Sequence, residues 1–100
     1  MENIAQADHG QRTISVRVRY LGSNKPYIKP QAAPVETAAH LKSEVLAFFG
    51  LVDGSGQPGG KVYTLTKGTV PVTDLSVSLG ELADGKHELK LDLLEQLEQG

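Results

Sequence analysis

The first regular pattern in the chain is the stretch TISVRVRYL. Every second residue is apolar, at Ile14, Val16, Val18 and Tyr20, and serine or arginine stands between them. Successive side chains of a strand point to opposite faces, so a period of two predicts a strand with one buried face and one face in water.

A second, returning strand is predicted next. The stretch LGSNKP is rich in turn-forming residues, and Tyr27 to Lys29 can then run back beside the first strand. Pro30 and Pro34 are expected to end the pairing there, because proline has no amide hydrogen to donate.

The period changes to three and four in VETAAHLKSEVLAFFGL, from Val35 to Leu51. Apolar residues at this spacing line one face of a helix. The positions concerned are Ala38, Leu41, Val45, Phe48 and Val52. Thr37 is the expected N-cap of this helix, and Gly50 is the expected stop.

Two more strands are predicted after the helix. KVYTLT, residues 61–66, is rich in β-forming residues, and HELKLDLL alternates leucine with charged residues. Between them, DLSVSLGEL is expected to form a turn of helix or a short crossing segment. A single helix with one apolar face must bury it on a sheet, so the order of elements predicts a two-layer α+β domain.

Composition and charge exclude several classes of function. The chain has 100 residues, enough for one domain, and its net charge of −2 does not indicate binding to nucleic acid or to an anionic membrane. It has no cysteine, which excludes disulfides and thiolate chemistry. No apolar run approaches the ~20 residues that span a bilayer. Residues 1–12 lack the pattern of a signal peptide and are expected to form a disordered leader, so we expect a cytoplasmic protein.

No catalytic, metal or cofactor site is predicted from local motifs. A GxGxxG at Gly54, Gly56 and Gly59 follows a helix and precedes a strand, which is the reverse of a dinucleotide site, so we interpret it as a linker. The three histidines have no metal-ligand partner at local spacing, and His40 is interpreted as an edge residue of the helix. No serine occupies a GxSxG elbow. We expect no enzymatic activity.

A protein-docking surface is one candidate for function. Arg17 and Arg19 lie on the polar face of the first strand, and Lys90 lies on the polar face of the last. If these strands are neighbours, the three residues form a basic stripe on an open sheet. Tyr63 and Leu65 on the third strand are the candidates for its apolar centre. A solvated sheet face without a partner is the alternative.

The end of the sequence is the second candidate. Residues 95–100 are expected to form a flexible tail that ends on Gly100. A glycine carboxylate is the least hindered acyl group that a chain can offer to a narrow enzyme channel. Gly100 is therefore a candidate acyl donor, although it can equally be a chain end without a role.

Taken together, these features resemble the ubiquitin-like β-grasp proteins, and more narrowly the bacterial ubiquitin-like proteins of conjugation-type operons. The resemblance covers residues 13–94 and rests on element order and on short motifs. The motifs are VRVRY in the first strand, Thr37 opening the helix and Phe49-Gly50 closing it, KVYTLTKG, Asp74 and Val77 in the short segment, and Gly85, Leu89 and Leu91 near the close.

The resemblance implies both a fold and a function. The sheet would be mixed, with four to five strands, and the first and last strands would lie parallel at its centre, with one helix packed across it. The carboxylate of Gly100 would be adenylated with ATP by an activating enzyme, passed through thioesters of conjugating enzymes, and joined to a lysine or another amine of a target protein. A deconjugating protease would be a further partner.

The tail departs from the pattern of eukaryotic modifiers, which end in two glycines after a basic segment. Here Gln99 precedes a single glycine, and Glu95 and Glu98 make the tail acidic. Two alternatives therefore stay open. One is a β-grasp module that binds partners through its sheet without reacting, and the other is a sulfur carrier that ends in a thiocarboxylate.

Overall fold

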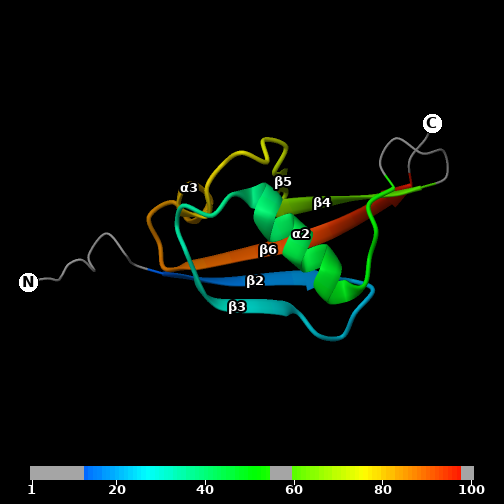
Figure 1. Ribbon diagram of the computed structural model, residues 1–100, viewed down its shortest axis with the longest axis horizontal. Helices are drawn as coiled ribbons and strands as arrows, with labels where there is room; N and C mark the ends of the chain where they lie inside the picture. Colours follow the sequence, from blue (N-terminus) through cyan, green and yellow to red (C-terminus); the bar gives the residue numbers. More distant parts are fainter. Residues whose placement is uncertain (1–12, 55–59, 98–100) are drawn as a thin grey trace, which may run out of the picture.

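The computed structural model describes residues 13–54 and 60–97. Within them the chain forms one mixed sheet of five strands and two helices, the α+β class expected from the sequence. The elements are β2 (Ile14–Tyr20), β3 (Tyr27–Ala32), α2 (Ala38–Phe49), β4 (Lys61–Lys67), β5 (Val70–Pro71), α3 (Leu79–Ala83) and β6 (Glu88–Leu97). Figure 1 shows α2 crossing over the sheet.

The order of strands in the sheet is β3-β2-β6-β4-β5. The last strand, β6, therefore lies in the middle, parallel to β2 on one side and antiparallel to β4 on the other. Because β2 and β6 are parallel, the beginning of β2 and the end of β6 lie at opposite ends of the sheet (Figure 1). The parallel pairing of the first and last strands agrees with what the resemblance implied.

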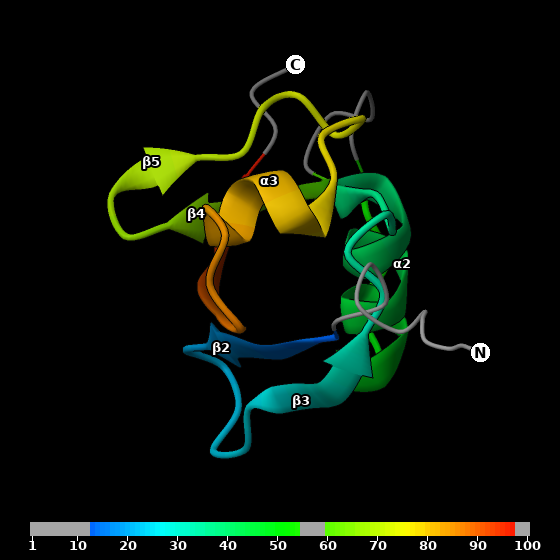
Figure 2. The same ribbon diagram turned by 90° about the vertical axis from the view of Figure 1, so that its left-hand side faces the viewer.

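The core lies between α2 and one face of the sheet. Figure 2 shows α2 standing on one side of the strands. The predicted apolar face of the helix is confirmed for Ala38, Leu41 and Val45, which are fully buried. It was wrong for Phe48 and Val52, which are exposed. Val52 lies beyond the end of α2, and the Phe48 ring lies against Tyr27 of the edge strand β3. No helix in the described segments is long and apolar enough to cross a membrane.

Both predicted ends of α2 are confirmed. The Thr37 side chain accepts a hydrogen bond from the amide of His40 at 3.2 Å, which satisfies one of the free amides of the first turn. Gly50 has a φ of 71°, a left-handed conformation that a side chain disfavours, and its amide bonds back to the last turn. The short segment before β6 forms the five-residue helix α3, whose capping box pairs Ser78 with Glu81.

The expectation that Pro30 ends the second strand was wrong. β3 continues to Ala32, and its pairing with β2 changes register: Ile14 faces Ala32, but Val16 faces Lys29. Two steps along β2 thus match three steps along β3, so Pro30 lies in a bulge. The strand is also at the edge of the sheet, where a missing amide breaks no ladder.

The expected boundary of the tail was also wrong. Residues 95–97 belong to β6, where Glu95 faces Tyr63 and Leu97 faces Lys61 of β4. The domain therefore extends three residues beyond Leu94. The expected leader, residues 1–12, and the last three residues lie outside the described part of the chain.

Candidate functional site

The basic residues predicted for a docking stripe lie on neighbouring strands. The parallel register of β2 and β6 sets Arg17 beside Lys90 and Arg19 beside Asp92. All four occupy the positions that alternate with the buried residues of their strands, so they lie on the face of the sheet that α2 does not cover. Arg19 donates to the Asp92 carboxylate from its Nε at 2.9 Å. Within residues 13–54 and 60–97, Arg17 and Lys90 form no ion pair, so the stripe holds two adjacent cations that a partner could pair with.

Tyr63 and Leu65 do not belong to this surface. They are 3% and 0% exposed, and they pack in the core beneath α2, on the opposite face of the sheet from Arg17. The sequence KVYTLT does not show which residues face the core, because Val62, Thr64 and Thr66 alternate with Tyr63 and Leu65 and can also be buried. The pairing with β6 decides the phase: Leu65 faces Leu93, and both are buried.

Leu94 supplies the apolar part of the open face instead. It is 45% exposed and lies across from Thr64 of β4. Next to the stripe is a shallow hollow of about 490 Å³, whose lining includes Arg17, Leu94 and the exposed Leu21 of the turn after β2. The sequence contained a signal for Leu94, because it is out of phase with Leu91 and Leu93 and so must point to the outer face.

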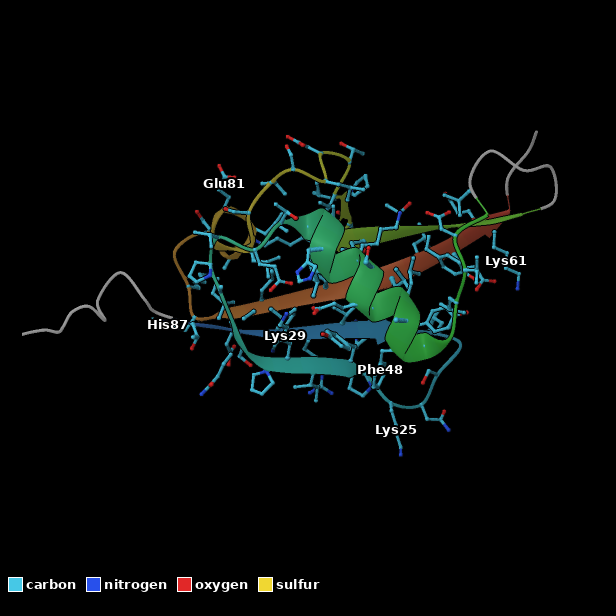
Figure 3. All side chains as sticks on the ribbon, in the orientation of Figure 1. Lys25, Lys29, Phe48, Lys61, Glu81 and His87 are labelled. Atoms are coloured by element: carbon cyan, nitrogen blue, oxygen red, sulfur yellow. The ribbon has the colours of Figure 1, made fainter. Side chains whose placement is uncertain are left out.

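The end of β6 is held in place by polar contacts. The Tyr20 hydroxyl donates to Glu95 Oε1 at 2.5 Å, and Lys61 Nζ lies 3.3 Å from the other Glu95 oxygen. The hydrogen bond to Glu95 raises the pKa of Tyr20 to about 12, with burial adding to the effect. Figure 3 places Lys61 at the end of the sheet where β6 finishes. Gly100, the predicted acyl donor, follows three residues after Leu97 and lies outside the described residues.

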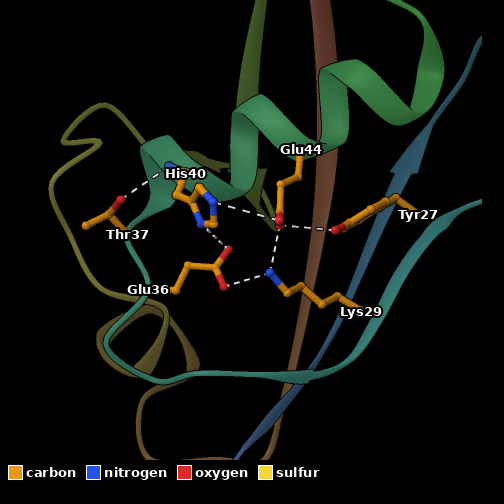
Figure 4. Close-up of polar contacts among 6 residues, drawn as sticks. All are labelled: Tyr27, Lys29, Glu36, Thr37, His40 and Glu44. Atoms are coloured by element: carbon orange, nitrogen blue, oxygen red, sulfur yellow. Dashed lines mark hydrogen bonds and ion pairs between the residues drawn. The ribbon is translucent and has the colours of Figure 1, made fainter.

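A second polar cluster bridges α2 and β3 (Figure 4). Lys29 Nζ donates to Glu36 Oε1 at 2.8 Å and to Glu44 Oε1 at 2.7 Å, and the Tyr27 hydroxyl donates to Glu44 at 3.2 Å. His40 lies between the two carboxylates, with Nδ1 3.2 Å from Glu36 Oε2 and Nε2 3.8 Å from Glu44 Oε2. The interpretation of His40 as an isolated edge residue was therefore incomplete. The missed signal is a carboxylate four residues before it and another four residues after it.

The charges in this cluster shift the pKa values of its members. Burial alone would lower the pKa of Lys29, but its hydrogen bonds to Glu36 and Glu44 raise that pKa above its usual value. The hydrogen bond from Lys29 lowers the pKa of Glu44. Burial raises the pKa of Tyr27, and the neighbouring Glu44 charge adds to the effect. Lys29 and Glu44 therefore carry opposite charges at neutral pH.

No family model matches the sequence, and no curated protein matches it.

Proposed function

We propose that this domain is a ubiquitin-like modifier of the β-grasp type, which is joined through the carboxylate of Gly100 to amines of target proteins. In this role it has no catalytic activity of its own. The activating, conjugating and deconjugating enzymes act on it, as in the bacterial conjugation-type pathways whose modifiers it resembles.

The course of β6 is the observation that carries the proposal. β6 lies in the middle of the sheet and ends at Leu97, three residues before Gly100. Leu97 faces Lys61 and Glu95 faces Tyr63 of β4, so the described part of β6 is fixed in the sheet up to its last residue. In the proposed role, this fixed strand gives the enzymes one defined place on the domain from which the acyl donor follows.

The chemistry would proceed through activated carboxylates. The Gly100 carboxylate attacks the α-phosphorus of ATP, which forms an acyl adenylate and releases pyrophosphate. A cysteine thiolate of an enzyme then displaces AMP to give a thioester. The neutral amine of a target attacks the thioester carbonyl, loses a proton and releases the thiol, and an amide bond remains. Glycine suits each attack because no side chain shields its carbonyl.

Deletion of Gly100 is expected to abolish covalent adducts. The test uses the protein with an N-terminal tag, expressed with its neighbouring genes, in intact and Gly100-deleted forms. The intact form should give denaturant-resistant species heavier than 10.7 kDa, and the deleted form should give none. Because Gly100 follows the last strand, both forms should unfold at the same temperature. Adducts that persist without Gly100 would contradict the proposal, and so would a thiocarboxylate on an otherwise unconjugated chain.

Non-covalent docking through the open sheet is the second candidate, and the pair of free cations Arg17 and Lys90 favours it. Charge reversal in Arg17→Glu or Lys90→Glu is expected to weaken capture of an acidic partner about tenfold or more, because like charges then meet at the interface. Lys86→Glu, an equal change of charge at an exposed turn position, is the matched control and should leave affinity unchanged. Equal weakening by all three variants would show a general charge effect and no docking site.

A further inference from the structure

We propose that Glu36, His40 and Glu44 form a binding site for a divalent transition-metal ion, with Zn²⁺ the ion that fits best. Each of the three side chains offers one ligand atom, and these atoms lie within 4.8 Å of one another. Glu36 precedes the N-cap of α2, and the other two follow on the first two turns of the helix, four residues apart. Spacing by four places side chains one above the other along a helix. The inference is independent of the proposed function.

The state of Glu36 points to a missing partner. Its side chain is only 7% exposed, and Lys29 occupies one of its two oxygens. The other oxygen, Oε2, is buried and accepts no hydrogen bond from any described residue. His40 Nδ1, 3.2 Å away, can pair with this oxygen only when that nitrogen carries a proton. Where it carries none, the buried oxygen is left without a donor, which is unfavourable, and a bound cation would satisfy both atoms. Figure 4 shows this carboxylate directed toward His40 and Lys29.

The distance between the first two ligand atoms already suits zinc. Bonds of about 2.0–2.1 Å in a tetrahedral site separate neighbouring ligand atoms by about 3.3 Å. Glu36 Oε2 and His40 Nδ1 are 3.2 Å apart. Glu44 Oε2 lies beside the other ring nitrogen, Nε2, at 3.8 Å, so the Glu44 carboxylate must turn toward the Nδ1 side of the ring to complete the set. The Glu44 side chain is 34% exposed and has room for this turn, which would loosen its hydrogen bonds to Lys29 and Tyr27. His40 is 60% exposed, so water can reach the fourth position.

The presence of Lys29 is compatible with a metal ion at this site, although its positive charge lowers the affinity for the ion. Its ammonium group binds the Oε1 atoms of Glu36 and Glu44, so the Oε2 atoms of both face His40. Two carboxylates against one ammonium leave a net negative charge at the imidazole. The ammonium also holds the Glu44 carboxylate in its charged form, the form that binds a metal.

The donor set selects among cations. An imidazole with carboxylates suits Zn²⁺ and its transition-metal neighbours. Mg²⁺ gains little from the imidazole nitrogen and gives up its water shell reluctantly. Binding of Zn²⁺ in clear preference to Mg²⁺ is therefore the signature that separates this site from a general acidic patch.

The test is a calorimetric titration of the full chain, without a polyhistidine tag, with ZnCl2 and separately with MgCl2. We expect one Zn²⁺ per chain at this cluster, and at least a tenfold loss of affinity in His40→Ala and in Glu44→Gln. His87→Ala is the matched control, since His87 precedes β6 at a distance from Lys29 (Figure 3), and it should bind Zn²⁺ like the parent. The NMR signals of the His40 ring should shift on addition of Zn²⁺, while those of His87 should stay.

Three results would overturn the proposal. The first is no Zn²⁺ binding at micromolar protein concentration, and the second is equal affinity for Mg²⁺. The third is Zn²⁺ binding that persists in His40→Ala, which would show that the ion binds at another histidine. Because His40 is mostly exposed, its substitution should leave the fold intact, and circular dichroism of each variant checks this.

Discussion

Leu65→Ala is expected to lower the free energy of unfolding by about 3–4 kcal/mol, a large part of the roughly 5–15 kcal/mol that stabilises a domain of this size. Leu65 is fully buried between β4 and α2, across from Leu93. Removing its three terminal carbon atoms loses their transfer free energy and leaves a cavity that a packed core fills only partly. Chemical denaturation of the parent and the variant, followed by circular dichroism, measures the difference.

Leu94→Ala is the matched control for this prediction. Leu94 lies on the neighbouring strand but on the open face, where it is 45% exposed, so the same substitution should cost about 1 kcal/mol or less. The two variants together test directly which residues of β4 and β6 face the core and which face the open side. Equal costs for the two variants would contradict the placement of Leu65 in the core and of Leu94 outside it.

Lys29→Met is expected to cost about 2–3 kcal/mol. Methionine keeps an apolar stem on β3, but the carboxylates of Glu36 and Glu44 lose the cation that they share at 2.8 and 2.7 Å. Removing one partner leaves an uncompensated charge on the buried Glu36, which is costly, and the estimate is reduced because Lys29 itself is 25% exposed. Equilibrium unfolding at neutral pH gives the value, and Lys86→Met at an exposed position is the control for losing a lysine, with an expected cost of about 0.5 kcal/mol or less.

The cost of Lys29→Met should depend on pH with a definite sign. Lys29 lowers the pKa of Glu44 in the folded protein, so its contribution is present above the usual carboxyl pKa and is lost as pH falls through the folded value. The difference in stability between the parent and Lys29→Met should therefore shrink between pH 7 and about pH 3. A difference that stays constant over this range would show that Lys29 acts by packing alone.

The alternating and helical patterns predicted most of the fold because they report burial, and burial forms the core. Val16, Val18, Leu89 and Leu91 follow a period of two and are buried in adjacent strands. Leu41 and Val45 follow the helical period and cover them. Thr37 and Gly50 marked the helix ends because their conformations are local and need no tertiary information.

The errors arose where the pairing between strands decides how far a strand extends and which face its residues occupy. Pro30 stays in β3 because the strand is an edge with a bulge, and neither fact can be read from a single segment. Tyr63 and Leu65 have alternating neighbours that suit either face, so the pairing with β6 was needed to fix their side. Glu95 was assigned to the tail because it is polar, yet contacts with Tyr20 and Lys61, distant in sequence, hold it in the strand.

The most direct test of the proposed modifier role is to map the linkage in adducts by mass spectrometry. Trypsin cleaves after Lys90, and the rest of the sequence, LDLLEQLEQG, contains no lysine or arginine. A conjugated target peptide should therefore carry this segment as a branch on a lysine, joined through Gly100. The account predicts that branch in cells that contain the neighbouring enzymes, and its absence from the Gly100-deleted protein. Unbranched target peptides in cells whose activating enzyme is shown to work would contradict it.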